Sequence, residues 1–199
     1  MSNYIFAPSP SFGVSEHPFV TYANAFNDEE IKLLTGQLDL LEQEVGVLGD
    51  GKSQEEIRSS SVSWVELTPT TQWLYDRMAW VARLLNGQFY KFDLYGFNEH
   101  MQYTVYDGKK NDHYTWHQDS GVMGGSNSPR KFSLILQLSD PSDYVGGDIE
   151  IYSNPQPGLV DKQKGLIVAF PSYTLHRVTP VTHGLRKTLV VWACGPSFK

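Results

Sequence analysis

The sequence predicts a mainly β protein, an antiparallel barrel or jelly roll with helices packed on one of its sheets. Apolar residues recur at helical spacing in two segments of the first 90 residues. From Lys91 onward the apolar period changes to two, and β-branched and aromatic residues dominate between turn residues. Two helices followed by about eight short strands are typical of a barrel or jelly roll whose helices cover one sheet.

The composition is that of a soluble globular domain. The 199 residues can bury a sizeable core, so we expect a single domain over 1–199. The formal net charge is −6 and Lys and Arg do not cluster, which argues against nucleic acid as a partner. We find no apolar run for a membrane span and no signal-peptide pattern, so we expect no membrane partner. Cys194 is the only cysteine, which favours a reducing cytoplasm, and nothing in the sequence indicates an oligomeric state.

Residues 1–26 are expected to form an N-terminal arm, and 27–90 a helical support. The aromatic residues of the arm that should lie against the core are Tyr4, Phe6 and Phe12. Asn27 can cap a helix, and Glu30 lies where a capping box places its carboxylate. This helix should end near Gly46. Its apolar residues at helical spacing are Ile31, Leu34, Leu38 and Leu41.

A strand over 62–67 should precede the second helix. That helix is expected to start after Thr68-Pro69, because Pro is tolerated in a first helical turn, and to stop at Asn86-Gly87. The residues of its predicted apolar face are Trp73, Met78, Val81 and Leu85, with Leu74 and Leu84 beside them.

A β core is expected over 91–195. The candidate strands are 91–96, 100–106, 114–118, 131–138, 148–153, 165–170, 173–178 and 186–193. The turns between them are Asp107-Gly108, Ser120 to Pro129, Gly146-Gly147, Asn154 to Gly158 and His183-Gly184. The loops 46–59 and 121–129 are expected to be mobile edges of an active site.

The strand over 131–138 predicts an interior that holds a ligand. The residues of the face expected under the helices are Phe132, Leu134, Leu136 and Leu138. Ser133, Ile135 and Gln137 alternate with them and should face the barrel interior. A polar Gln137 pointing inward is unusual for a plain core and fits a ligand pocket.

The pattern His117-Gln118-Asp119, with His176 far downstream, is typical of a split set of metal ligands. Side chains two apart on a strand share a face, so His117 and Asp119 can reach one ion. His176, from another predicted strand, can complete the two-His, one-carboxylate face that non-haem Fe(II) sites use. Each part alone is more often a simple hydrogen-bonded pair or core histidine, so the hypothesis depends on the combination.

Arg186 follows His176 at the start of the last predicted strand and could bind a carboxylate. Its guanidinium presents a planar fork of donors that matches a carboxylate. Thr188 shares a strand face with Arg186, so its hydroxyl can grip the same group. The plainer interpretation of Arg186 is a surface salt bridge.

Several stretches share the pattern of one known family. Residues 114–119 read Tyr-x-x-His-x-Asp, and residues 176–186 read His-x-Val-x-Pro-Val-x-x-Gly-x-Arg. The other matching stretches are Gly146-Gly147-Asp148-Ile149, residues 164–172 and the Arg-x-Ser segment in Ile57 to Ser61. Over roughly residues 55 to 195 the chain resembles the Fe(II)/2-oxoglutarate-dependent oxygenases. The similar branch is that of prolyl 4-hydroxylase-like and bacterial PKHD-type hydroxylases.

The resemblance implies a double-stranded β-helix with His117, Asp119 and His176 as Fe(II) ligands. It implies 2-oxoglutarate and O2 as cosubstrates and ascorbate as a reductant. It also implies that Arg186 binds the distal carboxylate of 2-oxoglutarate, and that Thr188 and Tyr106 hydrogen-bond the cosubstrate. Gln137 stands where some relatives place a tyrosine on this carboxylate, which is a departure from their pattern.

The resemblance also implies hydroxylation of an unactivated C–H bond, with a prolyl residue of a peptide or protein as the first candidate substrate. The residues expected on the substrate side are Arg58, Trp64, His113 and Trp192. Two alternatives stay open: a hydroxylase of a free amino acid or other small molecule, and a non-catalytic, cupin-like binding module. Nucleic-acid demethylation is disfavoured, because Trp192 stands where those enzymes carry a second arginine and because the chain is acidic.

Overall fold

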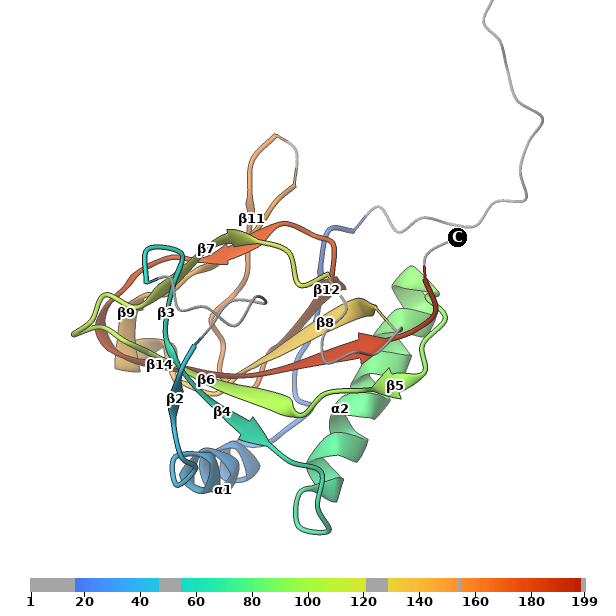
Figure 1. The fold of residues 1–199 in the computed structure, drawn as a ribbon, viewed down its shortest axis with the longest axis horizontal. Coiled ribbons are helices and arrows are strands. Elements are labelled where there is room, and N and C mark those ends of the chain that lie inside the picture. The colour runs from blue at the N-terminus through green and yellow to red at the C-terminus, as the bar shows by residue number, and fades with distance from the viewer. Residues whose placement is uncertain (1–16, 47–54, 121–128, 154, 198–199) are drawn as a thin grey trace, which may run out of the picture.

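The computed structural model describes residues 17–46, 55–120, 129–153 and 155–197. They form two facing antiparallel sheets with two α-helices on the outer side of the larger sheet (Figure 1). The predicted arm aromatics Tyr4, Phe6 and Phe12 lie outside the described residues, as do 47–54 and 121–128 of the two predicted mobile loops. No helix in the described ranges is long and apolar enough to cross a membrane.

The larger sheet is built around one long strand, β14 (Val181–Cys194), which pairs with β8 on one side and β6 on the other. The sheet order is β1 (Val20–Tyr22), β12 (Ile167–Pro171), β8 (Arg130–Gln137), β14, β6 (Met101–Asp107), β4 (Ser61–Val65) and β2 (Glu44–Val45). Two further short strands, β5 (Gly96–Phe97) and β9 (Tyr144–Gly146), also pair with β14.

The smaller sheet lies opposite and supplies both histidines of the predicted triad. Its order is β11 (Gly158–Leu159), β10 (Ile149–Ile151), β13 (His176–Val178), β7 (His113–His117) and β3 (Arg58–Ser59). Strands β13 and β7 pair so that His176 lies directly across from His117. Residues almost 60 positions apart are thereby neighbours on one sheet.

The described residues form three core clusters, and the two largest lie on opposite faces of the larger sheet. The outer part packs the helices α1 (Asp28–Leu38) and α2 (Gln72–Leu85) against the sheet, and Phe132, Leu134 and Leu136 are fully buried there. Ile135 faces the other way and packs in the second cluster with Ile149 and Phe170. The alternation predicted for 131–138 is therefore present, and it turns the polar residues of β8 toward the interior.

The first helix has the predicted start but a different end. Asn27 Oδ1 accepts from the Glu30 N–H at 2.9 Å, and Glu30 Oε2 accepts from the Asn27 N–H at 3.0 Å. The helix ends at Leu38, so the prediction of an end near Gly46 was wrong. The Asp39 carboxylate accepts from the Tyr103 hydroxyl at 2.5 Å and from the Lys187 ammonium. These tertiary bonds and the pairing of β2 outweigh further helical turns.

The second helix differs at both ends and in its buried face. It starts at Gln72 rather than directly after Pro69, because the Thr71 hydroxyl bonds the Glu66 carbonyl and closes a turn there. Asn86-Gly87 does not stop it: the coil continues as a π-helical turn over Asn86–Tyr90. Trp73 and Leu84, predicted for the apolar face, are 38% and 39% exposed. The residues buried on α2 are Leu74, Tyr75, Met78, Val81, Ala82 and Leu85.

Several strand predictions were wrong or too long, and one predicted turn was wrong. Residues 91–95 form no strand, because Lys91 adopts a left-handed conformation and the Asn86 side chain binds the backbone of Phe92. Residues 173–175 precede β13 rather than belonging to it. His183-Gly184 is not a turn but lies inside β14, where the strand changes from β9 to β6 as its partner. The strands missed from the sequence, all short, are β1, β2, β3, β9 and β11.

Candidate active site

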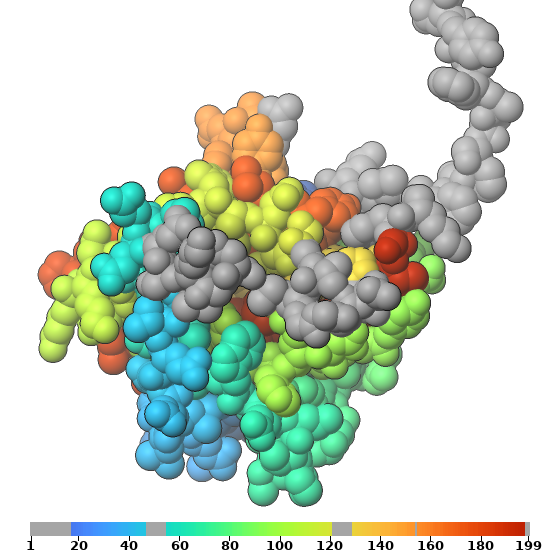
Figure 2. Space-filling model, in the orientation of Figure 1, coloured from blue at the N-terminus to red at the C-terminus, as the bar shows by residue number. Residues whose placement is uncertain are grey.

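A cavity of about 380 Å³ opens between the two sheets and holds most of the residues that the sequence singled out. Figure 2 shows the face on which it lies, with β7 above and β2 and β4 below. The inner positions of β14 line it in one row, from Arg186 through Thr188 and Val190 to Trp192. The row follows from the period of two, since alternate residues of a strand share a face.

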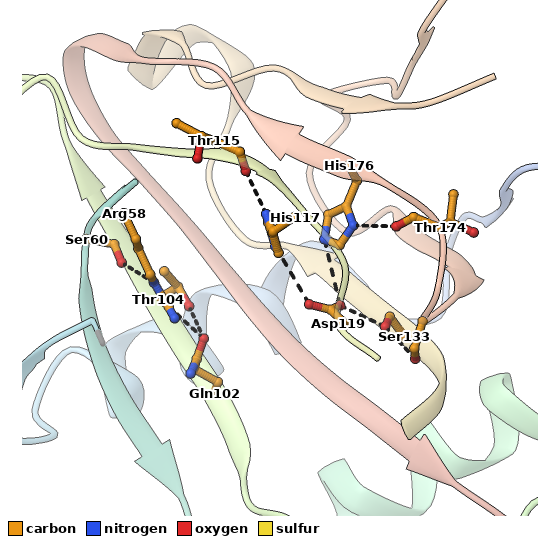
Figure 3. Close-up of polar contacts among 11 residues, drawn as sticks. Arg58, Ser60, Gln102, Thr104, Thr115, His117, Asp119, Ser133, Thr174 and His176 are labelled. Carbon is orange, nitrogen blue, oxygen red and sulfur yellow. Dashed lines mark hydrogen bonds and ion pairs between the residues drawn. The ribbon is translucent and has the colours of Figure 1, made fainter. Parts of the chain in front are cut away.

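His117, Asp119 and His176 converge at one end of this cavity (Figure 3). Their possible ligand atoms all lie within 4.8 Å of one another. Asp119 Oδ1 is 3.7 Å from His117 Nε2, and Asp119 Oδ2 is 3.7 Å from His176 Nε2. Asp119 lies two residues beyond the end of β7, so the expectation that it shares a strand with His117 was wrong, although the two side chains meet.

Backbone carbonyls fix the tautomer of both histidines. His117 Nδ1 lies 2.8 Å from the Thr115 carbonyl, and His176 Nδ1 lies 3.0 Å from the Thr174 carbonyl (Figure 3). A carbonyl oxygen can only accept, so Nδ1 is the protonated nitrogen, and in the neutral form of each ring Nε2 keeps its lone pair. Both lone pairs belong to the ring nitrogens nearest Asp119, as a metal site requires.

The protonation states of the cluster suit a cation. Burial, with His176 as the next cause, lowers the pKa of His117 to about 3, so this ring is neutral at pH 7. Burial alone would raise the pKa of Asp119, but His176, His117 and the Ser133 hydroxyl together bring it below its usual value. Two imidazoles and one carboxylate are a donor set that fits Fe(II) and leaves open positions.

Arg186 lies deeper in the cavity and is 2% exposed. Its Nε has no hydrogen-bond partner among the described residues, and none of their carboxylates forms an ion pair with it. Its terminal nitrogen donates to Gln137 Oε1 at 3.3 Å, and its guanidinium lies 5.3 Å from the ring centre of Tyr106. A buried charge without an ion-pair partner costs free energy. The Arg186 guanidinium is therefore suited to bind the carboxylate of a small acid.

The other predicted cosubstrate residues surround Arg186. Thr188 and Tyr106 line the same cavity and are 2% and 4% exposed. Burial raises the pKa of the Tyr106 phenol, which therefore stays a donor at neutral pH. Gln137 does not line the cavity; its amide bridges Arg186 and the Asp161 carbonyl. The structure thus places Gln137 behind the guanidinium.

Three of the four predicted substrate-side residues line the cavity. Arg58 donates to Ser60 Oγ and Gln102 Oε1 (Figure 3). Its guanidinium lies 4.9 Å from the ring centre of Tyr114. Trp64 and Trp192 line the wall at 39% and 5% exposure.

His113 is the exception among these four residues. Its ring lies near the carbonyls of Asn111 and Glu56, and it is not among the residues that line the cavity.

The sequence interpretation missed several polar residues of the cavity. Gln102 and Thr104 occupy the inner positions of β6 beside Tyr106, and the period of two in 100–106 could have shown them. Arg130 stacks on Trp192 at 3.7 Å and pairs with Glu99. No local signal in the sequence could have found that contact, because Glu99, Arg130 and Trp192 lie on different parts of the chain.

Two antiparallel sheets around a two-histidine, one-carboxylate site form a double-stranded β-helix, and solved structures share this fold. A prolyl 4-hydroxylase of Pseudomonas putida aligns with a TM-score of 0.70 at 19% identity, over 92% of this chain and 95% of that one. A prolyl hydroxylase of Trichoplax adhaerens was solved with a peptide fragment of hypoxia inducible factor. It aligns with a TM-score of 0.74 at 16% identity, over 90% of this chain and 84% of that one.

The sequence comparisons relate the β core to one family. The pattern of the 2OG-Fe(II) oxygenase superfamily matches residues 101–194. A PKHD-type hydroxylase of Teredinibacter turnerae is 40% identical over 82 residues, and one of Hyphomonas neptunium is 41% identical over 83. The matches cover 40% and 41% of this chain but 36% and 37% of those relatives, well under two thirds of their length. Residues 101–194 are thus similar to the 2OG-Fe(II) oxygenase superfamily, and the sequence relatives of this segment are PKHD-type hydroxylases.

Proposed function

We propose that this protein is an Fe(II)- and 2-oxoglutarate-dependent dioxygenase that hydroxylates an unactivated C–H bond. The observation that carries the proposal is the pairing of two features in one cavity. A converged two-histidine, one-carboxylate cluster lies at one end, and the buried Arg186 lies deeper, without an anionic partner among the described residues. A cupin-like binding module would have no use for Arg186, so we rank that alternative lower.

In this proposal His117, Asp119 and His176 hold the iron, and Arg186 with Thr188 binds the distal carboxylate of 2-oxoglutarate. Bound iron would couple oxidative decarboxylation of 2-oxoglutarate by O2 to hydroxylation of the substrate, with ascorbate as a possible reductant. Tyr106, protonated at neutral pH, donates a hydrogen bond to the cosubstrate. The protein contributes positions and charges rather than acid–base catalysis.

Aromatic side chains in the cavity wall hold the His117 ring in place and exclude water from the site. The Tyr114 ring stacks on the His117 imidazole at 3.5 Å with an angle of 11°, which limits rotation of that ring. Trp192 and Arg130 line the same cavity as Asp119, and the Arg130 guanidinium lies 3.7 Å from the ring centre of Trp192. A fixed imidazole and a dry wall keep the site in one geometry, which position-dependent chemistry needs.

We propose a prolyl residue of a peptide or protein as the substrate. The names of the structural relatives and the peptide bound by the Trichoplax adhaerens enzyme support this class. The single domain over 1–199 and the cytoplasmic setting, suggested by one cysteine, are part of the same proposal. So is the absence of a nucleic-acid or membrane partner.

A free amino acid is the second candidate substrate. The Arg58 guanidinium lies in the cavity against Tyr114, where its charge could attract a free carboxylate. Turnover of 2-oxoglutarate with free L-proline but not with N- and C-terminally blocked proline peptides would favour this candidate. The reverse pattern would favour the peptide.

An anaerobic ultraviolet–visible titration of the Fe(II)-loaded protein with 2-oxoglutarate tests the proposed function. We expect a weak visible charge-transfer band that is lost in His176→Ala and needs at least tenfold more 2-oxoglutarate in Arg186→Ala. The exposed Arg83 is a matched control, and Arg83→Ala should titrate like the wild type. Absence of the band in folded, iron-loaded wild type would overturn the proposal and move the binding module to first place.

A further inference from the structure

Asp119 lies beyond the end of β7 and is held by contacts with residues of other parts of the chain. Strand β7 ends at His117, so no strand pairing fixes the Asp119 backbone. One backbone bond lies next to it, from the Ser120 N–H to the Ser172 carbonyl at 2.8 Å. The direction of the carboxylate must therefore come from its side-chain partners.

Two buried serine hydroxyls lead to this carboxylate, and Figure 3 shows the nearer one, of Ser133. Ser133 Oγ donates to Asp119 Oδ2 at 2.8 Å, and Ser133 Oγ lies 2.9 Å from Ser172 Oγ. A carboxylate only accepts and a hydroxyl has one proton, so the Ser133 proton goes to Asp119. The Ser172 hydroxyl must then donate to Ser133. Such a chain strengthens its own last bond, because each donor polarises the next.

The two serines are buried in and next to the larger sheet. Both are 0% exposed. Ser133 belongs to β8, inside the larger sheet, and pairs with Phe170 of β12. Ser172 follows β12 directly, and its N–H donates to the Lys131 carbonyl at 2.9 Å. Ser172 therefore holds both the backbone beside Asp119 and, through Ser133, the side chain.

We propose that Ser172 and Ser133 form a serine relay that positions Asp119 for metal binding. Oδ1 lies 3.7 Å from His117 Nε2 and Oδ2 lies 3.7 Å from His176 Nε2, and the hydrogen bond from Ser133 distinguishes them: it occupies Oδ2 and leaves Oδ1 as the single donor atom for the metal. A one-oxygen contact leaves more of the metal's positions for other ligands than a two-oxygen contact would. The inference rests on the proposed metal site and adds two positioning residues to it.

The buried Trp192 indole N–H makes no hydrogen bond with any described residue. The serine relay is thus the one side-chain hydrogen bond that the structure gives the carboxylate within the described ranges. Removing it should free the carboxylate to rotate.

Cobalt(II) titration of the full-length, metal-free protein tests the relay without using activity. Affinity is measured by calorimetry, and the visible spectrum of the bound ion reports its coordination. We expect Ser133→Ala to weaken Co(II) binding about 10–100-fold, the usual effect of removing a partner of a metal ligand. Ser172→Ala should weaken it about two- to fourfold, because only the polarisation of the last bond is lost. The spectrum of saturated Ser133→Ala should change in intensity, which a merely destabilised protein would not show.

Ser139→Ala is the matched control. Ser139 is also a buried serine, and its hydroxyl bonds the Leu185 carbonyl and the Lys187 N–H, away from the metal cluster. We expect this variant to lose stability but to keep wild-type Co(II) affinity and spectrum. Ser133→Thr keeps a hydroxyl and should bind within a few-fold of wild type, which matters if Ser133→Ala does not fold.

The outcomes separate the relay from the proposed function. Wild-type affinity and spectrum in both Ser133→Ala and Ser172→Ala would overturn the relay and leave the metal site standing. If Ser133→Ala is unfolded, wild-type behaviour of Ser172→Ala overturns the relay by itself. A wild-type protein that binds Co(II) no better than His176→Ala would overturn the metal site and the relay together.

Discussion

Gln137 shows how one buried amide can set the direction of a guanidinium. Its Nε2 donates to the Asp161 carbonyl at 2.6 Å, which leaves Oε1 to face Arg186. An oxygen in that position accepts from Arg186 and cannot donate to a carboxylate. The residue is therefore better described as orienting Arg186 than as a ligand of 2-oxoglutarate, which was the role the family resemblance suggested.

Gln137→Glu would place a negative charge of nearly the same shape against Arg186. We expect 2-oxoglutarate affinity to fall at least tenfold, because the new carboxylate neutralises the guanidinium and repels the dicarboxylate. Co(II) affinity should stay within about twofold, since Gln137 has no contact with the metal cluster. Calorimetry with 2-oxoglutarate on the Co(II)-loaded protein measures both, and the exposed Gln163→Glu is the control. Unchanged 2-oxoglutarate affinity would contradict the orienting role.

At the scale of elements, β14 is the strand on which the site depends. It starts against β9, and from Leu185 onward it pairs with β6. Gly184 stands at this change with φ +71°, and a Cβ there would lie 1.9 Å from the Asp143 carbonyl oxygen. Only glycine tolerates both the conformation and the close approach. The change of partner sets the row that begins with Arg186 two residues later.

Gly184→Ala is therefore expected to destabilise the fold by about 1–3 kcal/mol, the range for a residue forced into the left-handed region. It should also weaken 2-oxoglutarate binding, because the backbone must shift next to Arg186. We expect the opposite effect from Gly36→Ala. Gly36 is exposed within α1 with open space around it, so alanine should raise the free energy of unfolding by about 0.5–1 kcal/mol. Chemical denaturation of both variants tests the pair; stabilisation by Gly184→Ala would refute the account of β14.

At the scale of the whole molecule, Asp39 joins three elements. It follows the end of α1 and accepts from the Tyr103 hydroxyl of β6 and from the Lys187 ammonium of β14. Burial alone would raise its pKa, but the bonds from Lys187 and Tyr103 outweigh burial, and the pKa lies below the usual value of 3.8. A carboxyl with a lowered pKa stabilises the fold above pH 3.8 and loses that contribution as the pH falls through the lowered value.

Asp39→Asn should consequently lower the free energy of unfolding at neutral pH, and the gap to wild type should shrink as the pH falls below about 3.8. Urea unfolding at pH values between 2 and 7 measures the gap. Asp76→Asn, at an exposed carboxylate on α2, is the control and should show a smaller gap at neutral pH. A gap that stays constant across this range would show that the charge of Asp39 makes no contribution.

The sequence by itself determined the local features of this protein. Period-two alternation placed Gln137 inside the barrel, the capping box marked the start of α1, and the spacing of the motifs selected the residues that meet in the cavity. These features are encoded by neighbours in the chain, so propensity and periodicity can detect them.

Only the tertiary structure decided the features that depend on distant partners. The Asp39 bonds end α1 before Gly46, the pairing with β9 and β6 makes a strand of the predicted turn at Gly184, and the Ser133 hydroxyl finds Asp119. Each of these outcomes is a competition between a local preference and a long-range contact. Long-range contacts are fixed by the packing of the two sheets, because only packing brings remote residues within hydrogen-bonding distance and removes water from between them.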